Sequence, residues 1–287
     1  MGDRGLLFFI CIASCFFFLA ERCKQPLATL RERLHLSVRA TLLLHFVLEL
    51  ANAETETFTT ILQFDAIHAK FVDYATFQLD SLMQTGQATE EQVKKAEERV
   101  VKTAYYFDQT TLVNVADKSI SVYSVIPPSL YFYQEGVNGI SWQLTEETDT
   151  ICGYLCNKAV GEYGGRTWNV WFSSEIPSQF GPWKFGGLPG LIMYACDTEN
   201  IHRFKAITFR QGTTPITAPK ISNSITTSRE KFIKAKNHFE ENPIANIPTE
   251  SITDMRVEKG DGGSNSVFIN GVQVRLRTNG YVPLEIK

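Results

Sequence analysis

The chain has 287 residues, of which 44% are hydrophobic and 21% charged, as is usual for a globular protein. Its formal net charge of −3 gives no reason to expect a nucleic-acid partner, because such proteins carry a basic patch. The sequence also lacks the spacings of a P-loop, a zinc protease and an EF-hand, so we expect neither a cofactor nor a metal.

Two apolar runs near the N-terminus indicate an exported protein. Leu6–Ala20 is shorter than the about 20 residues that a membrane span needs. Ala40–Leu50 follows basic residues and precedes an Ala-Asn-Ala sequence that ends at Ala53, which is the order of a secretory signal. We therefore predict a leader over residues 1–53, cleaved after Ala53, and a mature chain without a membrane span in the periplasm or cell envelope. The alternative is that the first run is itself the signal or an anchor.

Two segments have the pattern of a capped helix. Residues 89–92 (TEEQ) form a capping box, and apolar side chains recur behind it at helical spacing, so we expect a helix over Glu90–Tyr106. A second capping box at residues 227–230 (TSRE) opens a helix that ends before Asn242.

The rest of the predicted mature chain, residues 54–287, has the sequence pattern of short strands. Phe58–Leu82 is rich in β-prone residues and predicts one or two strands. From Thr110 onward, apolar runs alternate with turn residues, and Asn270-Gly271 is the strongest hairpin signal. The sequence therefore predicts a single mainly β (α+β) domain, with an antiparallel, curled or half-barrel sheet and about two helices.

Thr167–Asp197 is the densest run of Trp, Gly and Pro in the chain. Two apolar segments flank a connection rich in Pro and Gly, which indicates two strands joined by a rigid, shaped loop. Within that loop, Pro189-Gly190 fits the central positions of a type II turn, since only Gly reaches the second position at low cost.

The same loop carries a resemblance to a known family. Residues 187–192 spell GLPGLI, and EIP at 175–177 and GPWKF at 181–185 precede it. A W…T…GY-x-C-x-KA…W pattern runs from Trp142 to Trp171. The chain resembles the GLPGLI, or Porph-ging, family closely over residues 140–210 and loosely outside them. That family is a group of exported proteins of undefined function, so the resemblance implies a compartment but no reaction or ligand.

All four tryptophans lie in or beside this region. Strand alternation places Trp168 and Trp171 on opposite faces. If the face of Trp168 forms the core, Trp171 lines a groove, a second core layer or the surface. We predict an apolar groove, closed at one end by the GLPGLI loop, that binds a lipid, a peptide or an envelope protein. The candidate binding residues are Trp171, Glu175, Trp183, Lys184, Gly187, Leu188, Pro189 and Gly190. The alternative is that these aromatics form a large core.

No catalytic motif is visible, and we predict no catalytic residue. His202 is the only histidine near the GLPGLI loop, with Asp197 close in sequence. A His–carboxylate pair can act as an acid–base site, but a strand histidine beside a turn is more often structural. The leading interpretation is a non-enzymatic protein. The alternatives are a hydrolase whose site is not visible in the sequence and a purely structural or interaction protein.

Three cysteines follow the predicted leader. Cys152 and Cys156 fall on one predicted strand, about 13 Å apart, which is beyond disulfide reach. A bridge between Cys156 and Cys196 on neighbouring strands is geometrically feasible, and three free thiols are the alternative.

Overall fold

The computed structural model describes residues 41–51, 55–103, 107–127, 129–137, 139–212, 214–219, 223–247, 249–259, 265–274 and 282–287. The strands are β1 (Thr41–Ala51), β2 (Thr55–Phe64), β3 (His68–Asp73), β4 (Gln109–Asn114), β5 (Ser119–Ile126), β6 (Ser129–Gly136), β7 (Gln143–Ile151), β8 (Tyr154–Tyr163), β9 (Arg166–Ser173), β10 (Leu191–Asp197), β11 (His202–Gly212), β12 (Ile225–Thr226), β13 (Met255–Lys259), β14 (Asn265–Ile269) and β15 (Val272–Val274). The helices are α3 (Tyr74–Gln84), α4 (Glu90–Thr103), α5 (Arg229–Glu241) and the short α6 (Pro243–Asn246), with a 3-10 turn at Thr249–Ser251.

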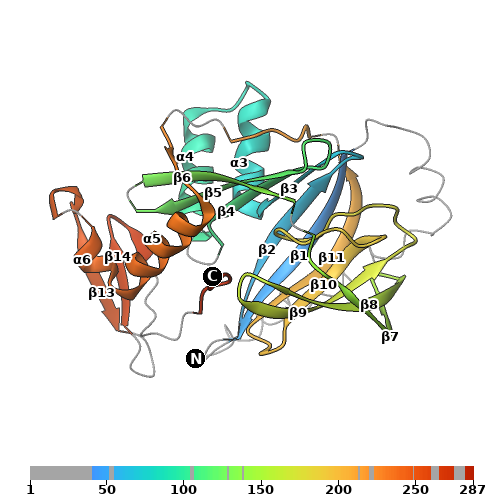
Figure 1. Ribbon diagram of the computed structural model, residues 1–287. Helices are drawn as coiled ribbons and strands as arrows, with labels where there is room; N and C mark the ends of the chain where they lie inside the picture. Colours follow the sequence, from blue (N-terminus) through green and yellow to red (C-terminus); the bar gives the residue numbers. More distant parts are fainter. Residues whose placement is uncertain are drawn as a thin grey trace, which may run out of the picture.

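One 12-stranded sheet dominates the molecule, in the order β12-β6-β5-β4-β3-β2-β1-β11-β10-β9-β8-β7 (Figure 1). All neighbouring strands in it are antiparallel except the β12–β6 pair, and the sheet stays open, with β12 and β7 as its edges. A separate three-stranded sheet, β13-β14-β15, lies beside α5 and α6 (Figure 1). The mainly β prediction is confirmed.

The helices agree with the sequence patterns in two places and differ in one. Thr89 and Gln92 exchange the hydrogen bonds of a capping box, and α4 begins directly after Thr89. The helix α5 begins one residue later than predicted, because Ser228 is its N-cap. The prediction of about two helices missed α3. Its N-cap, Asp73, accepts a hydrogen bond from the Thr76 amide and ends β3, although β-prone residues continue beyond it.

The predicted leader is only partly described. Residues 1–40 and 52–54, which include the predicted cleavage site at Ala53, lie outside the described residues. Thr41–Ala51 forms β1 and pairs with β2 on one side and β11 on the other. Since β2 and β11 both run antiparallel to β1, they run parallel to each other. A chain cleaved after Ala53 would lack the strand between them. Among the described helices, none is long and apolar enough to cross a membrane.

The segment from Thr150 to Gly161, predicted as one strand, is a hairpin. Cys152 and Gly153 both have positive φ angles, 51° and 80°, and form the turn between β7 and β8. The predicted hairpin at Asn270-Gly271 is present between β14 and β15, with positive φ at both turn residues. β10 and β11 also pair antiparallel, as a hairpin.

The described residues form two main hydrophobic cores. The larger lies between strands β2, β3 and β8–β11 and the loop at residues 174–190, and it holds Trp168, Trp183 and Phe185. The second lies between β5, β6, α5 and the small sheet, and it includes Tyr133 and Phe232. The GLPGLI loop therefore supplies side chains to the larger core rather than covering an open groove.

Gly190 is needed for close approach and not for a type II turn. Its φ is not positive, whereas Gly187 has a φ of +86°. A Cβ on Gly190 would lie 2.6 Å from the carbonyl carbon of Ser173, where β10 begins beside the end of β9. The predicted type II turn at Pro189-Gly190 is wrong, and the contact with Ser173 explains the glycine.

We predict that Gly190→Ala lowers the free energy of unfolding by about 3 kcal/mol, because the added methyl group must displace backbone. Gly139→Ala is the matched control, since a Cβ there has no neighbour within 4 Å, and it should change stability by no more than about 0.5 kcal/mol. Urea denaturation of the two variants measures the difference, and equal midpoints would contradict the packing argument.

Candidate functional site

The GLPGLI loop turns Trp183 and Lys184 toward the interior. Trp183 adopts a φ of +55°, and two side chains of β4 fix it there. Thr111 Oγ1 donates to the Trp183 carbonyl at 2.9 Å, and the indole Nε1 donates to Gln109 Oε1 at 2.9 Å. Both hydrogen bonds are buried. The strained Trp183 is therefore held through its backbone carbonyl and through its indole ring.

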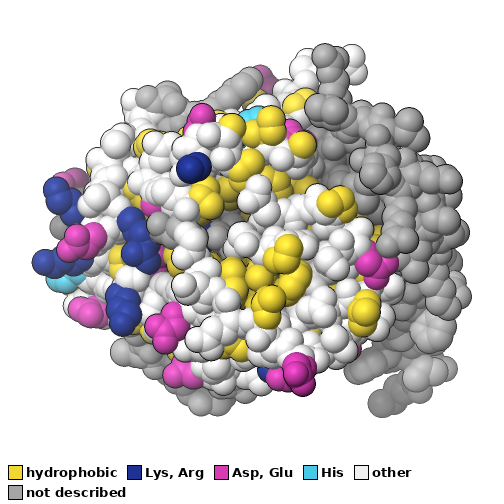
Figure 2. Space-filling view, turned by 45° about the vertical axis from the view of Figure 1, so that its right-hand side comes forward, with side chains coloured by type: hydrophobic (Ala, Val, Ile, Leu, Met, Phe, Trp, Pro, Cys, Tyr) yellow, Lys and Arg dark blue, Asp and Glu magenta, His cyan; other side chains and the backbone are white. Residues whose placement is uncertain are grey.

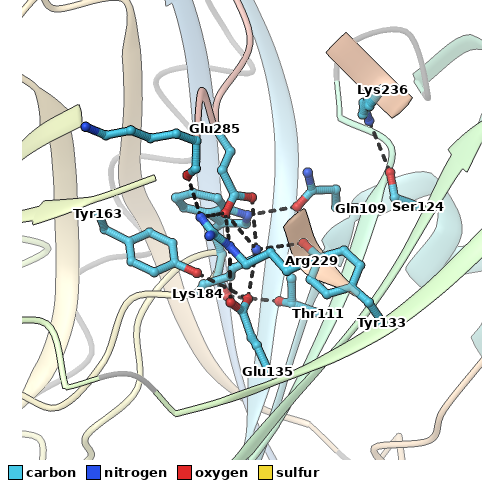
Figure 3. A network of polar contacts seen from close by, with 12 residues as sticks. Gln109, Thr111, Ser124, Tyr133, Glu135, Tyr163, Lys184, Arg229, Lys236 and Glu285 are labelled. Atoms are coloured by element: carbon cyan, nitrogen blue, oxygen red, sulfur yellow. Dashed lines mark hydrogen bonds and ion pairs between the residues drawn. The ribbon is translucent and has the colours of Figure 1, made fainter. Parts of the chain in front are cut away.

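Lys184 is the centre of a buried polar cluster (Figure 3). Its ammonium lies 2.9 Å from Glu135 and 2.9 Å from Glu285, and it donates to the Tyr133 hydroxyl at 2.8 Å. The Lys184 side chain is fully buried, and the two carboxylate side chains are 7% and 5% exposed. The ammonium also faces the rings of Tyr133 and Trp183. Its three hydrogens therefore have three oxygen partners.

Arg229, the first residue of α5, supplies a second cation to the same carboxylates. Its guanidinium donates to Glu285 Oε1 from Nε at 2.7 Å and contacts the same oxygen from Nη2. It also lies 3.3 Å from Glu135 Oε2. Tyr163 completes the cluster by donating to Glu135 Oε1 at 3.2 Å. Two cations therefore balance two carboxylates in a buried site.

The surroundings of the two tyrosines keep both phenols neutral. Burial raises the pKa of Tyr133 and of Tyr163 far above the ordinary value, and the nearby charges of Glu285 and Glu135 raise it further. Burial is the largest single influence on the pKa of Arg229 and lowers it, but Glu285, Tyr163 and Glu135 together raise the pKa overall. The phenols thus act as hydrogen-bonding groups and not as bases.

A second polar network surrounds His202. Its Nδ1 lies 3.2 Å from Asp197 Oδ2, and its Nε2 lies 3.1 Å from the Val282 carbonyl. Burial alone would raise the pKa of Asp197, but hydrogen bonds from His202 lower it overall. Arg166 donates to Asp197 at 3.0 Å and to the Pro283 carbonyl at 2.7 Å. Both ring nitrogens of His202 face oxygens of the fold, and the His202 and Asp197 side chains are 2% and 1% exposed, so the pair is not open to a substrate.

The outer face of β8, β9 and β10 carries a different group of side chains. Alternation holds as predicted: Trp168 is buried, whereas Trp171 is half-buried on the opposite face. The ring of Trp171 packs edge-on against Tyr194, with centroids 5.1 Å apart. The Lys158 ammonium lies 5.4 Å from the Trp171 ring and pairs with Glu147 at 2.7 Å.

The prediction that side chains of the GLPGLI loop line an open groove is wrong. Trp183, Lys184 and Leu188 are 1%, 4% and 4% exposed, so they cannot line a surface open to a ligand. Gly187 and Pro189 are exposed, and Gly190 is buried against Ser173. Figure 2 shows hydrophobic side chains on one face in several separate patches, with most Lys and Arg gathered at one side.

Glu175 lies in the loop that follows β9 and contacts the backbone of β8. It is half-buried, and its Oε1 accepts a hydrogen bond from the Leu155 amide at 3.1 Å. It therefore fixes the end of β8, at the margin of the outer face.

Of the two alternatives for the described cysteines, the structure has the free thiols, and Cys156 and Cys196 are not bridged. Cys156 is fully buried on the core side, where its sulfur lies 4.0 Å from that of Met193. Cys196 pairs with Asn169, two residues from Trp171, and so lies on the outer face. Burial raises the pKa of Cys156 to about 12, which keeps it protonated and unreactive.

Sequence reasoning missed most of the buried cluster. Glu285 lies 101 residues from Lys184 along the chain, and Tyr133 lies 51 residues from it. None of the cluster residues Tyr133, Glu135, Arg229 and Glu285 belongs to a local motif. The one available signal was Lys184 itself, a charged residue between Trp183 and Phe185 in an otherwise apolar loop.

No protein-family model and no curated protein matches the chain. Among solved structures it is similar to PNGF-II, in the P21 crystal form, at 13% identity and a TM-score of 0.48, over 78% of this chain and 39% of that one. The C2 form of PNGF-II gives 14% identity and a TM-score of 0.47, over 79% and 40%. An uncharacterized conserved protein from Thermus thermophilus gives 9% and 0.35, over 71% and 100%. The chain thus spans about two fifths of PNGF-II, and likenesses this distant assign no function.

We predict that Tyr133 and Tyr163 ionise only when the protein unfolds. Their pKa values are raised in the folded state, so the stability linked to them is complete below the unfolded pKa of about 10 and is lost as the pH rises above it. Absorbance of phenolate, followed during alkaline titration, should show two tyrosines that ionise together with unfolding. Double replacement by Phe should remove that step. Ionisation of every tyrosine near pH 10 in the folded protein would contradict the burial argument.

Lys184→Met should lower the free energy of unfolding by about 3 to 5 kcal/mol, because it leaves a surplus of buried carboxylate. The control is Lys95→Met, which breaks an exposed helix pair with Glu91 and should cost no more than about 1 kcal/mol. Chemical denaturation compares the two. If Lys184→Met lowers the free energy of unfolding no more than Lys95→Met does, the cluster is not a stabilising element.

Proposed function

We propose that this chain is an exported protein of the GLPGLI family that binds a partner protein through the outer face of β8, β9 and β10 and has no enzymatic activity of its own. The observation that carries the proposal is the half-buried Trp171 on that face, packed against Tyr194 and under the Lys158 ammonium. The proposal keeps Trp171 and Glu175 as contact residues.

The composition of this face suits a protein interface. Trp and Tyr are enriched among the residues that contribute most to binding energy, since they bury a large area at low entropic cost. Lys205 pairs with Tyr194 across the β10–β11 ladder and is exposed, so cations lie at both sides of the aromatic pair. Leu155 on β8 is 55% exposed and adds apolar area near Glu175. Such a patch combines an aromatic centre with a charged rim.

Two observations disfavour the alternatives. A lipid carrier needs an open apolar groove, and the residues predicted to line one at the GLPGLI loop are buried. A hydrolase needs a base that reaches the substrate, and the His202 side chain is only 2% exposed, with both ring nitrogens facing oxygens of the fold itself.

Export rests on the two apolar runs of the sequence and on the family resemblance, and the position of β1 adds a constraint on it. Cleavage after Ala53 would remove β1, and β2 and β11 would then each lose a ladder of hydrogen bonds. Intact-mass measurement of the exported protein decides between the sites. A mass that corresponds to residues 54–287 supports the predicted cleavage, whereas retention of Thr41–Ala51 moves the cleavage site upstream of β1.

The binding proposal predicts that Trp171→Ala abolishes association with the envelope partner without unfolding the protein. The full chain is mildly cross-linked in the exporting cell and purified. Native mass spectrometry then measures the mass of the complex and of the partner released from it. Tyr123→Ala is the matched control. Tyr123 is also half-buried and packs against Phe132, with ring centroids 5.0 Å apart, but it lies on β5, in the other half of the sheet. A wild-type protein found only as a free monomer, or equal loss in both variants, would contradict the proposal.

A further inference from the structure

The C-terminal segment, residues 282–287, lies against the turn between β8 and β9. The Ile286 amide donates to the Gly164 carbonyl at 2.7 Å. Gly164 and Gly165 have φ angles of +62° and +84°, and a Cβ on Gly165 would lie 3.0 Å from the Lys287 side chain. The turn is therefore shaped so that another segment of backbone can approach it closely.

Side chains of two other strands hold the backbone of the same segment. Arg166 on β9 donates to the Pro283 carbonyl at 2.7 Å, and His202 on β11 lies 3.1 Å from the Val282 carbonyl. Arg229 on α5 donates to the Lys287 carbonyl at 2.6 Å. Backbone groups held at intervals by a fixed scaffold are what an extended peptide ligand requires.

The site recognises one side chain of the segment by its charge. The Glu285 carboxylate reaches the buried cluster, where Lys184 and Arg229 both donate to it (Figure 3). Without that carboxylate, the buried Lys184 and the half-buried Arg229 would face the single charge of Glu135. An unbalanced buried charge is costly, so the site selects a carboxylate at this position.

The segment contributes little apolar surface of its own. Ile286 is 46% exposed and Lys287 is exposed, and Leu284 is only half-buried. Its attachment is therefore mainly polar, and every group that holds it belongs to the rest of the fold. A different peptide with the same backbone and an acidic side chain could make the same contacts.

We propose that Gly164, Arg166, Lys184, His202 and Arg229 form a binding site for an extended peptide segment of another protein that carries an acidic side chain, and that residues 282–287 occupy this site until such a peptide displaces them. The site lies on the core side of β9, opposite the outer face that carries Trp171, so the inference does not depend on the function proposed above. The chain regulates its own access, because the segment competes with the incoming peptide at a high effective concentration.

The test uses the full chain with Glu285→Ala and two synthetic peptides, VPLEIK and VPLQIK. Isothermal calorimetry should show that the variant binds VPLEIK at least about tenfold more tightly than VPLQIK, because a charge-assisted hydrogen bond is lost with the glutamine. The wild-type chain should bind VPLEIK more weakly than the variant does. Equal affinity of the folded variant for both peptides, or no binding of either, would overturn the proposal.

A second measurement does not depend on the stability of the variant. Hydrogen exchange of the wild-type chain reports the Ile286 amide, which is protected by the Gly164 carbonyl. Excess VPLEIK should accelerate exchange at Ile286, and VPLQIK should do so far less. If millimolar VPLEIK leaves the exchange rate of the Ile286 amide unchanged, the segment is a fixed part of the fold and the proposal is wrong.

Discussion

The fold depends on one buried ammonium group. Lys184 lies between Glu135 of β6 and Glu285 of the C-terminal segment, with Tyr133 as its third oxygen partner. Removing these charges from water costs several kcal/mol for each ion, and only complete pairing offsets that cost. The GLPGLI loop, β6 and α5 must therefore be in place together, with a carboxylate at the position that Glu285 occupies. The site makes the fold specific because no partial arrangement satisfies it.

The cluster lies where the two hydrophobic cores meet, which explains how distant parts of the main sheet are held together. Trp183, next to Lys184, packs against Trp168 in the larger core, with ring centroids 6.0 Å apart. Tyr133, on the other side, packs against Phe232 of α5 at 5.1 Å. The two faces of β9 then have separate roles. Its inner face supports the cluster and the C-terminal segment, and its outer face carries the half-buried Trp171, which we propose as a contact for a partner protein.

The sequence predicted what local chemistry determines. The capping box at Thr89, the Asn270-Gly271 hairpin and the alternation of Trp168 and Trp171 all follow from neighbouring residues, and all are present. The helix α3 was missed because its aromatic residues suit a strand equally well, and only the Asp73 cap distinguishes them. The cluster was missed because its members lie far apart in sequence. Trp183 and Lys184 were placed at a rim, since nothing local reveals that Glu135 and Glu285 balance a buried lysine.

A double-mutant cycle on Lys184→Met and Glu285→Gln tests this account most directly. The free energies of unfolding of the wild type, the two single variants and the double variant give the energy of interaction between the GLPGLI loop and the C-terminal segment. If the buried pair joins them, the double variant should be more stable than the sum of the single losses implies, by about 1 to 3 kcal/mol. Additive losses, within about 0.5 kcal/mol, would show that the two charges act independently and that the fold does not depend on their pairing.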